Sequence, residues 1–248
     1  MCGRYVSTRG QQDLADLFQA TPWDPRESLA PNWNVAPTNN VWAVLDGPDP
    51  ETGEVVRRLR TLRWGLVPSW AKSLATGAKM INARAETVAE RPAYRRAFAK
   101  RRCLLPADGY YEWVPVPAAE GKKPYKEPYF ISPRDGQVMA MAGLYEFWRD
   151  STVPKDDDPS AWVASCTVLT TDASDDAGRI HSRMPLAIAP DDWDSWLDPA
   201  HENPGELRDL LAAPAAGHLD VKAVSRSVNS VRNNGPQLLD PPEPSPGT

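Results

Sequence analysis

The sequence has few cysteines, no long apolar run and no targeting signal. Its 248 residues include three Cys, at positions 2, 103 and 166, an odd number that fits no disulfide framework in a chain of this size. No stretch approaches the ~18 consecutive apolar residues of a membrane-spanning helix, and the first residues lack the apolar core of a signal peptide. We therefore expect a protein of the reducing cytoplasm, with no membrane partner.

Metal-binding and cofactor-binding motifs are also missing. The three His, at positions 181, 201 and 218, are isolated, and the Cys lie far apart, so no metal-ligand spacing is present. There is no glycine-rich phosphate loop and no Gly-x-Ser-x-Gly nucleophile elbow. These absences predict that the protein uses neither a metal ion nor a cofactor.

Proline, in contrast, is abundant and argues against a helical bundle. The chain has 26 Pro, about twice the usual share of ~5%. Strand signals come in runs rather than alternating with helices. This pattern favours one α+β domain with a mainly antiparallel, curved, barrel-like sheet flanked by helices. We expect that domain to span residues 1–239, followed by a disordered Pro-rich tail at 240–248.

Local patterns predict the individual elements. Helices are expected at 8–20, 86–102, 191–197 and 205–212, the first with Thr8 and Gln11 at capping-box spacing. Strands are expected at 41–45, 55–66, 110–114, 129–131, 138–145, 161–171, 185–189 and 221–225. The turn at 47–53 should join the first two strands into a hairpin, whereas 22–37 is expected to be a loop in which Asn34 caps a turn.

Charge is distributed unevenly along the chain. Residues 1–105 carry 16 Lys and Arg against 10 Asp and Glu, a net of +6, whereas residues 106–248 carry 12 against 23, a net of −11. A basic part within an acidic protein suits nucleic-acid binding. A basic stretch is, however, more commonly a solvated surface.

Cys2 can offer a pair of neighbouring nucleophiles that no other residue provides. Removal of Met1 would leave a free α-amine and a thiol on adjacent carbons, both partly nucleophilic near neutral pH. An aldehyde could condense with the amine to a Schiff base, and the thiol could then close a thiazolidine ring. From its position alone, a Cys at position 2 with no role is the preferred interpretation.

Six short motifs occur in a fixed order, beginning with the Met1–Tyr5 segment MCGRY. The others are WNVAPT (33–38), RWGLVPSWA (63–71), INARAET (81–87), RCLLPADGYYEW (102–113) and IHSRMP (180–185), with VNSVRNNGP (228–236) near the end. This set resembles the SRAP (SOS response-associated peptidase) family of abasic-site processing proteins over roughly residues 2–239. The chain departs from the family in longer loops at 46–54, around 115–127 and at 150–160, and in its tail.

The resemblance implies a covalent reaction with single-stranded DNA that contains abasic sites, in which the N-terminal Cys captures the sugar aldehyde as a thiazolidine. By motif match, the catalytic candidates are Cys2 as nucleophile, Glu112 as acid/base, His181 for opening the sugar ring and Asn82 beside the amine. The protein would then associate with the nucleoid when bound to DNA.

The resemblance also implies DNA contacts. Arg4, Arg84 and Arg183 match phosphate-contact positions, and each lies two residues from a catalytic candidate. On an extended segment, residues two apart share a face. Trp70 is the candidate for base stacking, whereas Trp64 is expected in the core. The arginines at 91–102 either widen a positive groove or form helix surface.

Three functions remain open at this point. The first is the covalent adaptor, with β-elimination from the Schiff base (lyase activity) as a side reaction. The second is a thiol peptidase, a hydrolase as in the family name, using Cys2, His181 and Glu112. The third is a non-catalytic single-strand binder. We expect a monomer, because the sequence has no heptads and no long exposed apolar edges.

Overall fold

The computed structural model describes residues 2–117, 124–154, 158–174, 177–211 and 217–243. The strands are β1 (Tyr5–Ser7), β2 (Thr21–Pro22), β3 (Asn32–Val35), β4 (Asn40–Pro48), β5 (Val55–Trp64), β6 (Asn82–Arg84), β7 (Arg102–Ala107), β8 (Gly109–Val116), β9 (Tyr125–Pro133), β10 (Met139–Arg149), β11 (Trp162–Asp172), β12 (Arg183–Pro185) and β13 (Leu219–Ala223). The α-helices are α1 (Gln11–Phe18), α2 (Arg95–Lys100), α3 (Ala177–Ile180), α4 (Trp193–Leu197) and α5 (Pro204–Asp209). The 3₁₀ helices are η1 (Leu74–Lys79), η2 (Pro159–Ala161), η3 (Pro190–Asp192), η4 (Arg226–Asn229) and η5 (Pro236–Leu239).

Five strands close into a barrel. The predicted hairpin is confirmed as β4–β5, and antiparallel pairing continues from β4 through β7 and β10 to β11. The ring closes where β11 runs parallel to β5, with Ser165 opposite Arg63 and Cys166 opposite Trp64. The predicted α+β class with a curved, mainly antiparallel barrel is thus confirmed. Short strands β2, β6 and β12 extend this sheet.

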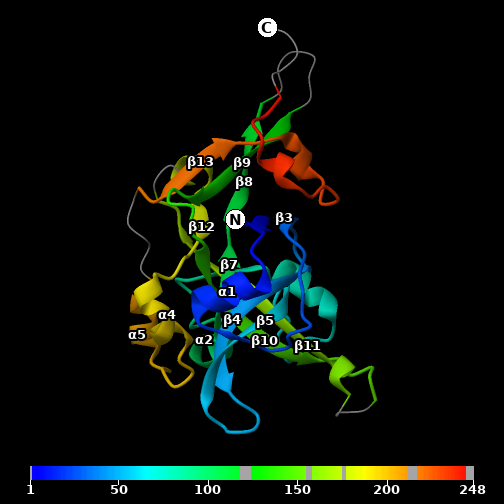
Figure 1. The fold of residues 1–248 in the computed structure, drawn as a ribbon, viewed down its shortest axis with the longest axis vertical. Coiled ribbons are helices and arrows are strands. Elements are labelled where there is room, and N and C mark those ends of the chain that lie inside the picture. Colours follow the sequence, from blue (N-terminus) through cyan, green and yellow to red (C-terminus); the bar gives the residue numbers. More distant parts are fainter. Residues whose placement is uncertain (1, 118–123, 155–157, 175–176, 212–216, 244–248) are drawn as a thin grey trace.

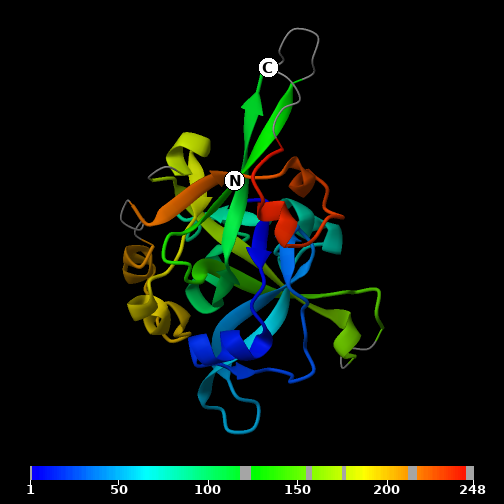
Figure 2. The same ribbon diagram turned by 45° about the horizontal axis from the view of Figure 1, so that its top comes forward.

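A second, five-stranded sheet lies beside the barrel, in the order β13-β9-β8-β1-β3. Figures 1 and 2 show its central β8–β9 ribbon, in green, extending beyond the barrel, with β13 alongside. The N-terminal strand β1 pairs with both β8 and β3. This sheet therefore contains both the start of the chain, as β1, and a strand near its end, β13, with β8 and β9 between them.

The core follows the alternation of the barrel strands. On β4, Val41 and Ala43 point inward, whereas Trp42 and Val44 point outward. The outward cluster also includes Leu14 and Phe18 from α1, Phe98 from α2, Trp196 from α4 and Leu207 from α5. The helices α1, α2, α4 and α5 thus cover the outer face of the barrel, and each contributes apolar side chains to that layer.

Arg102 departs most from its predicted place. The expected helix 86–102 is only α2, because the segment containing Pro92 forms turns. Arg102 instead begins β7 and is 2% exposed. Its guanidinium donates to the carbonyls of Phe98 (2.8 Å) and Ala99 (2.6 Å) near the end of α2, and to those of Trp196 (2.6 Å) and Asp198 near the end of α4.

This arrangement gives Arg102 a role in the fold. The last carbonyls of a helix have no partner within it, and a buried donor can satisfy them. Burial lowers the pKa of Arg102 to about 10, so the side chain stays charged at neutral pH. Arg102 is thus neither helix surface nor part of a positive groove.

Other differences are smaller. Thr8 does not cap α1, which begins after Gly10 with no side-chain cap; its hydroxyl and N–H both donate to Asp108 Oδ2 at 2.7 Å. The expected loop 22–37 contains β3, and β6 and β7 were not predicted. The short strands β1 and β2 were not predicted either. The prediction of a strand at 185–189 is wrong, because β12 ends at Pro185 and Ala187 forms only an isolated bridge with Met141. The other predicted strands and helices are present with shifted ends.

The predicted C-terminal tail at 240–248 is described only in part. In the predicted tail, Asp240 accepts a hydrogen bond from Ser225 N at 2.9 Å, while 244–248 lie outside the described residues. Within the described parts of the chain, no helix has both the length and the apolar character needed to cross a membrane.

Candidate functional site

Cys2 is held at the end of the barrel. It precedes β1 and is completely buried. Asn82 begins β6, which pairs with barrel strand β11, and its Nδ2 donates to the Cys2 carbonyl at 2.7 Å. The Cys2 sulfur lies 3.8 Å from the Arg4 carbonyl. The structure therefore brings Asn82 to the backbone of Cys2, fixed by a barrel strand.

The surroundings of Cys2 keep its thiol protonated. Burial raises the pKa of the Cys2 thiol well above its usual value, and the negative charge of nearby Glu112 raises it further. Glu112 lies on β8 and is only 4% exposed. A reaction that uses the sulfur as a nucleophile therefore needs a base to remove its proton.

An open pocket of about 580 Å³ lies at this point. It is lined by Gly3, Arg4, Glu112, Trp113, Lys126, His181 and Asn229. The pocket thus brings together three of the predicted residues, Arg4, Glu112 and His181. Sequence reasoning missed Lys126, which falls in a segment treated only as extra loop, and Asn229, which lies in the C-terminal motif without an assigned role.

Arg4 joins the two ends of the chain at this pocket. Its Nη1 donates to Asn34 Oδ1 at 2.6 Å and to the Val228 carbonyl at 3.0 Å, and its guanidinium lies 5.7 Å from the centre of the Trp113 ring. Asn34 is 3% exposed and donates to the Val228, Ser230 and Asn233 carbonyls. Asn34 therefore fastens the C-terminal segment rather than capping a turn.

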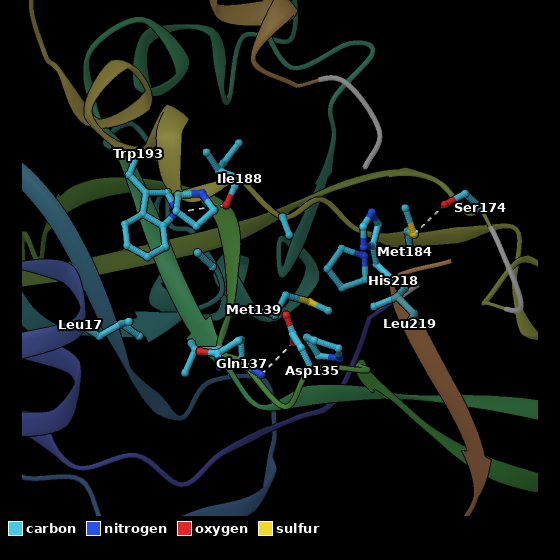
Figure 3. A pocket seen from close by; sticks show the side chains of 16 residues that line it. Leu17, Asp135, Gln137, Met139, Ser174, Met184, Ile188, Trp193, His218 and Leu219 are labelled. Carbon is cyan, nitrogen blue, oxygen red and sulfur yellow. Dashed lines mark hydrogen bonds between the residues drawn. The ribbon is translucent and has the colours of Figure 1, made fainter. Parts of the chain in front are cut away.

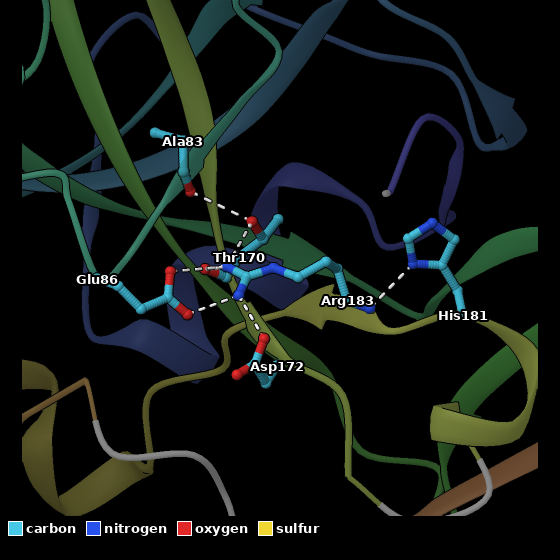
Figure 4. A network of polar contacts seen from close by, with 6 residues as sticks. All are labelled: Ala83, Glu86, Thr170, Asp172, His181 and Arg183. Atoms are coloured by element: carbon cyan, nitrogen blue, oxygen red, sulfur yellow. Dashed lines mark hydrogen bonds and ion pairs between the residues drawn. The ribbon is translucent and has the colours of Figure 1, made fainter.

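His181 enters the pocket from the end of α3. The backbone N–H of Arg183 donates to His181 Nδ1 at 2.9 Å (Figure 4). In the neutral ring this contact makes Nδ1 the acceptor, so the proton lies on Nε2. His181 therefore can offer an N–H donor to a group in the pocket.

Arg183 is occupied by the protein itself. It is 9% exposed, and its terminal nitrogens donate to Glu86 Oε1 (2.6 Å) and Oε2 (2.9 Å), to Asp172 Oδ1 (2.8 Å) and to the Thr170 carbonyl (2.5 Å) (Figure 4). These four contacts use the four terminal hydrogens of the guanidinium. The ion pair with Glu86 raises the pKa of Arg183 and lowers that of Glu86.

Arg183 and His181 do not share a face as the two-residue spacing predicted. Figure 4 shows the Arg183 side chain running toward Glu86, away from the His181 ring. The reason is local: β12 begins only at Arg183, and the preceding residues turn so that His181 can accept from the Arg183 backbone. The predicted phosphate contact of Arg183 stays a prediction.

Two further predicted DNA contacts lie outside the pocket wall. Arg84 is exposed at the end of β6, the same strand that carries Asn82. Trp70 is 67% exposed, whereas Trp64 is fully buried and donates from Nε1 to the Ile81 carbonyl at 2.9 Å. The prediction of Trp64 as a core residue is confirmed.

A second pocket, of about 320 Å³, has a different character. It lies between β12, α4 and the start of β13, and Figure 3 shows Met139, Met184, Ile188 and Trp193 around it. It shares no lining residue with the pocket of about 580 Å³ that Glu112 and His181 line, and it contains none of the predicted site residues. Across the described ranges, no three His, Cys, Asp or Glu side chains gather as metal ligands.

Comparison with known proteins adds to this geometry. Residues 1–231 match the family described as SOS response associated peptidase (SRAP). The chain is 37% identical over 241 residues to the abasic site processing protein YoaM of Bacillus subtilis, covering 97% of this chain and 98% of YoaM. It is 30% identical over 279 residues to the abasic site processing protein HMCES of Gallus gallus, covering 98% of this chain and 78% of that protein.

The fold agrees with these sequence matches. A crystal structure of a protein from Bacteroides thetaiotaomicron superposes with a TM-score of 0.77 at 21% identity, covering 97% of this chain and 99% of the other. A Bordetella bronchiseptica structure superposes with a TM-score of 0.67 at 26% identity, covering 90% and 100%. With nearly its whole length matched, this chain belongs to the SRAP family of abasic site processing proteins.

Proposed function

We propose that the protein captures abasic sites in single-stranded DNA by forming a covalent bond between Cys2 and the aldehyde of the opened sugar. The observation that carries the proposal is an open pocket lined by Glu112 and His181, together with its wall residues Gly3 and Arg4, which directly follow the buried Cys2 in the chain.

The reaction begins with the amine of Cys2, freed by removal of Met1. The amine adds to the aldehyde carbon, and loss of water from the carbinolamine gives a Schiff base. The thiol then adds to the C=N carbon, and nitrogen takes up a proton, which closes the thiazolidine. Glu112 accepts and returns the protons of these steps, because it is the buried carboxylate near the sulfur.

The other residues hold the sugar and the strand. His181 Nε2–H donates to the ring oxygen as the sugar opens, and Asn82 fixes the backbone of Cys2. The Nε and Nη2 groups of Arg4, together with Lys126, supply cations at the pocket for phosphates. Arg84 and exposed Trp70 serve the flanking nucleotides. A phosphate at Arg183 would have to displace Glu86 or Asp172.

The intact mass of the protein, before and after incubation with an abasic oligonucleotide, tests this proposal. We expect loss of Met1, followed by a mass increase of one oligonucleotide less one water. The control oligonucleotide without an abasic site should add nothing. Cys2→Ala should abolish the stable adduct, and Cys2→Ser should leave only a Schiff base that borohydride traps. An undiminished adduct with Cys2→Ala would refute the proposal.

A thiol peptidase is the second candidate, because the same three side chains form a nucleophile, a base and a third polar group. The geometry favours it less, because a peptidase attacks first with the thiolate and the raised pKa keeps the thiol protonated, whereas aldehyde capture begins with the amine. Release of a peptide from a generic substrate without any aldehyde would support this alternative. Salt-sensitive binding with no adduct would support a passive single-strand binder.

A further inference from the structure

Tyr110 lies against the Cys2 site on the same strand as Glu112. Side chains two apart on a strand point to the same side, so Tyr110 and Glu112 share one face of β8. Tyr110 is paired directly with Tyr5 of β1, and both pack in one cluster with Cys2. The site thus has a tyrosine hydroxyl to which the proposed chemistry assigns no task.

The Tyr110 hydroxyl is buried and unsatisfied. The side chain is 1% exposed, and its oxygen has no hydrogen-bond partner among the residues that the structure describes. Burial raises the pKa of Tyr110, and the charges of Cys2 and then Glu112 raise it further, so both groups lie within electrostatic reach of the phenol. An unsatisfied buried hydroxyl costs stability, which a Phe of the same shape would avoid.

Tyr111 provides the contrast on the opposite face of the same strand. Its hydroxyl donates to the Trp33 carbonyl at 2.8 Å, and its ring packs in a different cluster from Cys2. Tyr111 therefore has an ordinary structural hydrogen bond, whereas Tyr110 keeps an unused donor in the same buried cluster as Cys2.

We propose that Tyr110 is a positioning residue whose hydroxyl donates a hydrogen bond to the Cys2 sulfur as the thiol gives up its proton. This inference rests on the proposed function. In the ring-closing step the S–H proton passes to Glu112, a sulfur electron pair forms the C–S bond, and the C=N π pair moves to nitrogen. Nitrogen then takes the proton from Glu112. Tyr110 keeps its own proton and stabilises the negative charge on sulfur.

The ionisable groups facing the sulfur come from several elements. Glu112 and Tyr110 belong to β8 and Tyr5 to β1, while Cys103 of β7 and Cys166 of β11 pack in the same cluster. Among the described residues of this cluster the tyrosines carry the O–H donors, and Tyr110 shares its face of β8 with Glu112, whereas Tyr5 lies on the neighbouring strand β1. This makes Tyr110 the better placed of the two.

The test compares Tyr110→Phe with the matched control Tyr111→Phe. Two rates are measured against pH: cross-linking to the abasic oligonucleotide, and alkylation of Cys2 by iodoacetamide, separated from the other thiols by peptide mass mapping. We expect Tyr110→Phe to slow both rates about tenfold near neutral pH, as befits one hydrogen bond to a charged group. It should also move the midpoint of the alkylation profile to higher pH, with Tm unchanged or raised.

Tyr111→Phe should lower Tm and leave the alkylation profile of Cys2 unchanged. Rates and a profile for Tyr110→Phe equal to those of the unsubstituted protein would overturn the inference. The two proposals fail separately: absence of any adduct in the unsubstituted protein would sink the proposed function, whereas the alkylation profile reports on Tyr110 without DNA.

Discussion

At the scale of single residues, the guanidinium of Arg183 is a buried charge whose hydrogen-bond partners all belong to the protein's own fold. Glu86, Asp172 and Thr170 surround it, and its backbone N–H orients His181. The side chain therefore links the Asn82–Glu86 region and β11 to the segment that presents the pocket imidazole. The electrostatic contribution of the Arg183–Glu86 contact to stability depends on the ionisation of Glu86.

Glu86→Gln should lower stability in a pH-dependent way. The pKa of Glu86 is lowered in the folded state, so its ion pair stabilises the fold above the usual carboxyl range, and this contribution is lost as pH falls through the folded pKa. Because the Glu86 side chain is 45% exposed, we expect a loss of about 1 kcal/mol or less at pH 7.

Urea unfolding at pH 7 and below pH 4 measures this effect. The difference between Glu86→Gln and the unsubstituted protein should shrink at the lower pH. Glu90→Gln, which breaks the more exposed pair with Arg208, is the control and should show a smaller difference. A Glu86→Gln difference that is constant across this range would contradict the assignment.

The motifs predict only some of the residues that line the pocket. The sequence singles out Cys2, Glu112 and His181, because nucleophile and acid/base groups stand within recognisable motifs. Lys126 and Asn229 have no such signal: each is an ordinary surface residue type, and only the pairing of β8 with β9 and the ties of Asn34 bring them to the pocket. Long-range contacts of this kind leave no local pattern.

At the scale of elements, alternation and turn chemistry were sufficient for most of the longer strands and failed for β7 and for short strands such as β3 and β6. β7 is buried along its whole length, so it lacks a period of two, and its first residue is an arginine. β3 and β6 have four and three residues, too short for a periodic signal, and exist because β1 and β11 offer them partners. Tertiary contacts decided these segments.

Arg102→Leu tests the contact that joins two helices to the barrel. The substitution leaves the carbonyls near the ends of α2 and α4 buried without their donor, and we expect it to destabilise the protein by about 3 kcal/mol. Thermal or urea unfolding measures the loss. Arg96→Leu, on the exposed face of α2, should change Tm little; equal effects of the two would rule out the proposed role of Arg102.

At the scale of the whole molecule, the formal charge of −5 conceals the local cations Arg4, Arg84 and Lys126, which are the proposed DNA contacts. If Arg84 contacts a phosphate, Arg84→Gln should weaken single-strand binding uniformly across sequences. It should also reduce the slope of log K against log salt by about 0.7, the value for one single-strand phosphate contact. Fluorescence anisotropy over a salt series measures both. Arg208→Gln, on α5 and away from the β8–β9 ribbon (Figure 1), should leave the slope unchanged; an unchanged slope for Arg84→Gln would exclude the contact.

The link between Arg4 and the Val228 carbonyl has a consequence for synthesis of the protein. Translation delivers Cys2 first and the segment around Val228 among the last. Until the last part of the chain has been synthesised, the segment around Cys2 lacks the part of the pocket wall that Asn229 provides. The pocket is thus complete only once nearly the entire polypeptide has emerged, so the proposed aldehyde capture would begin only when synthesis is almost finished.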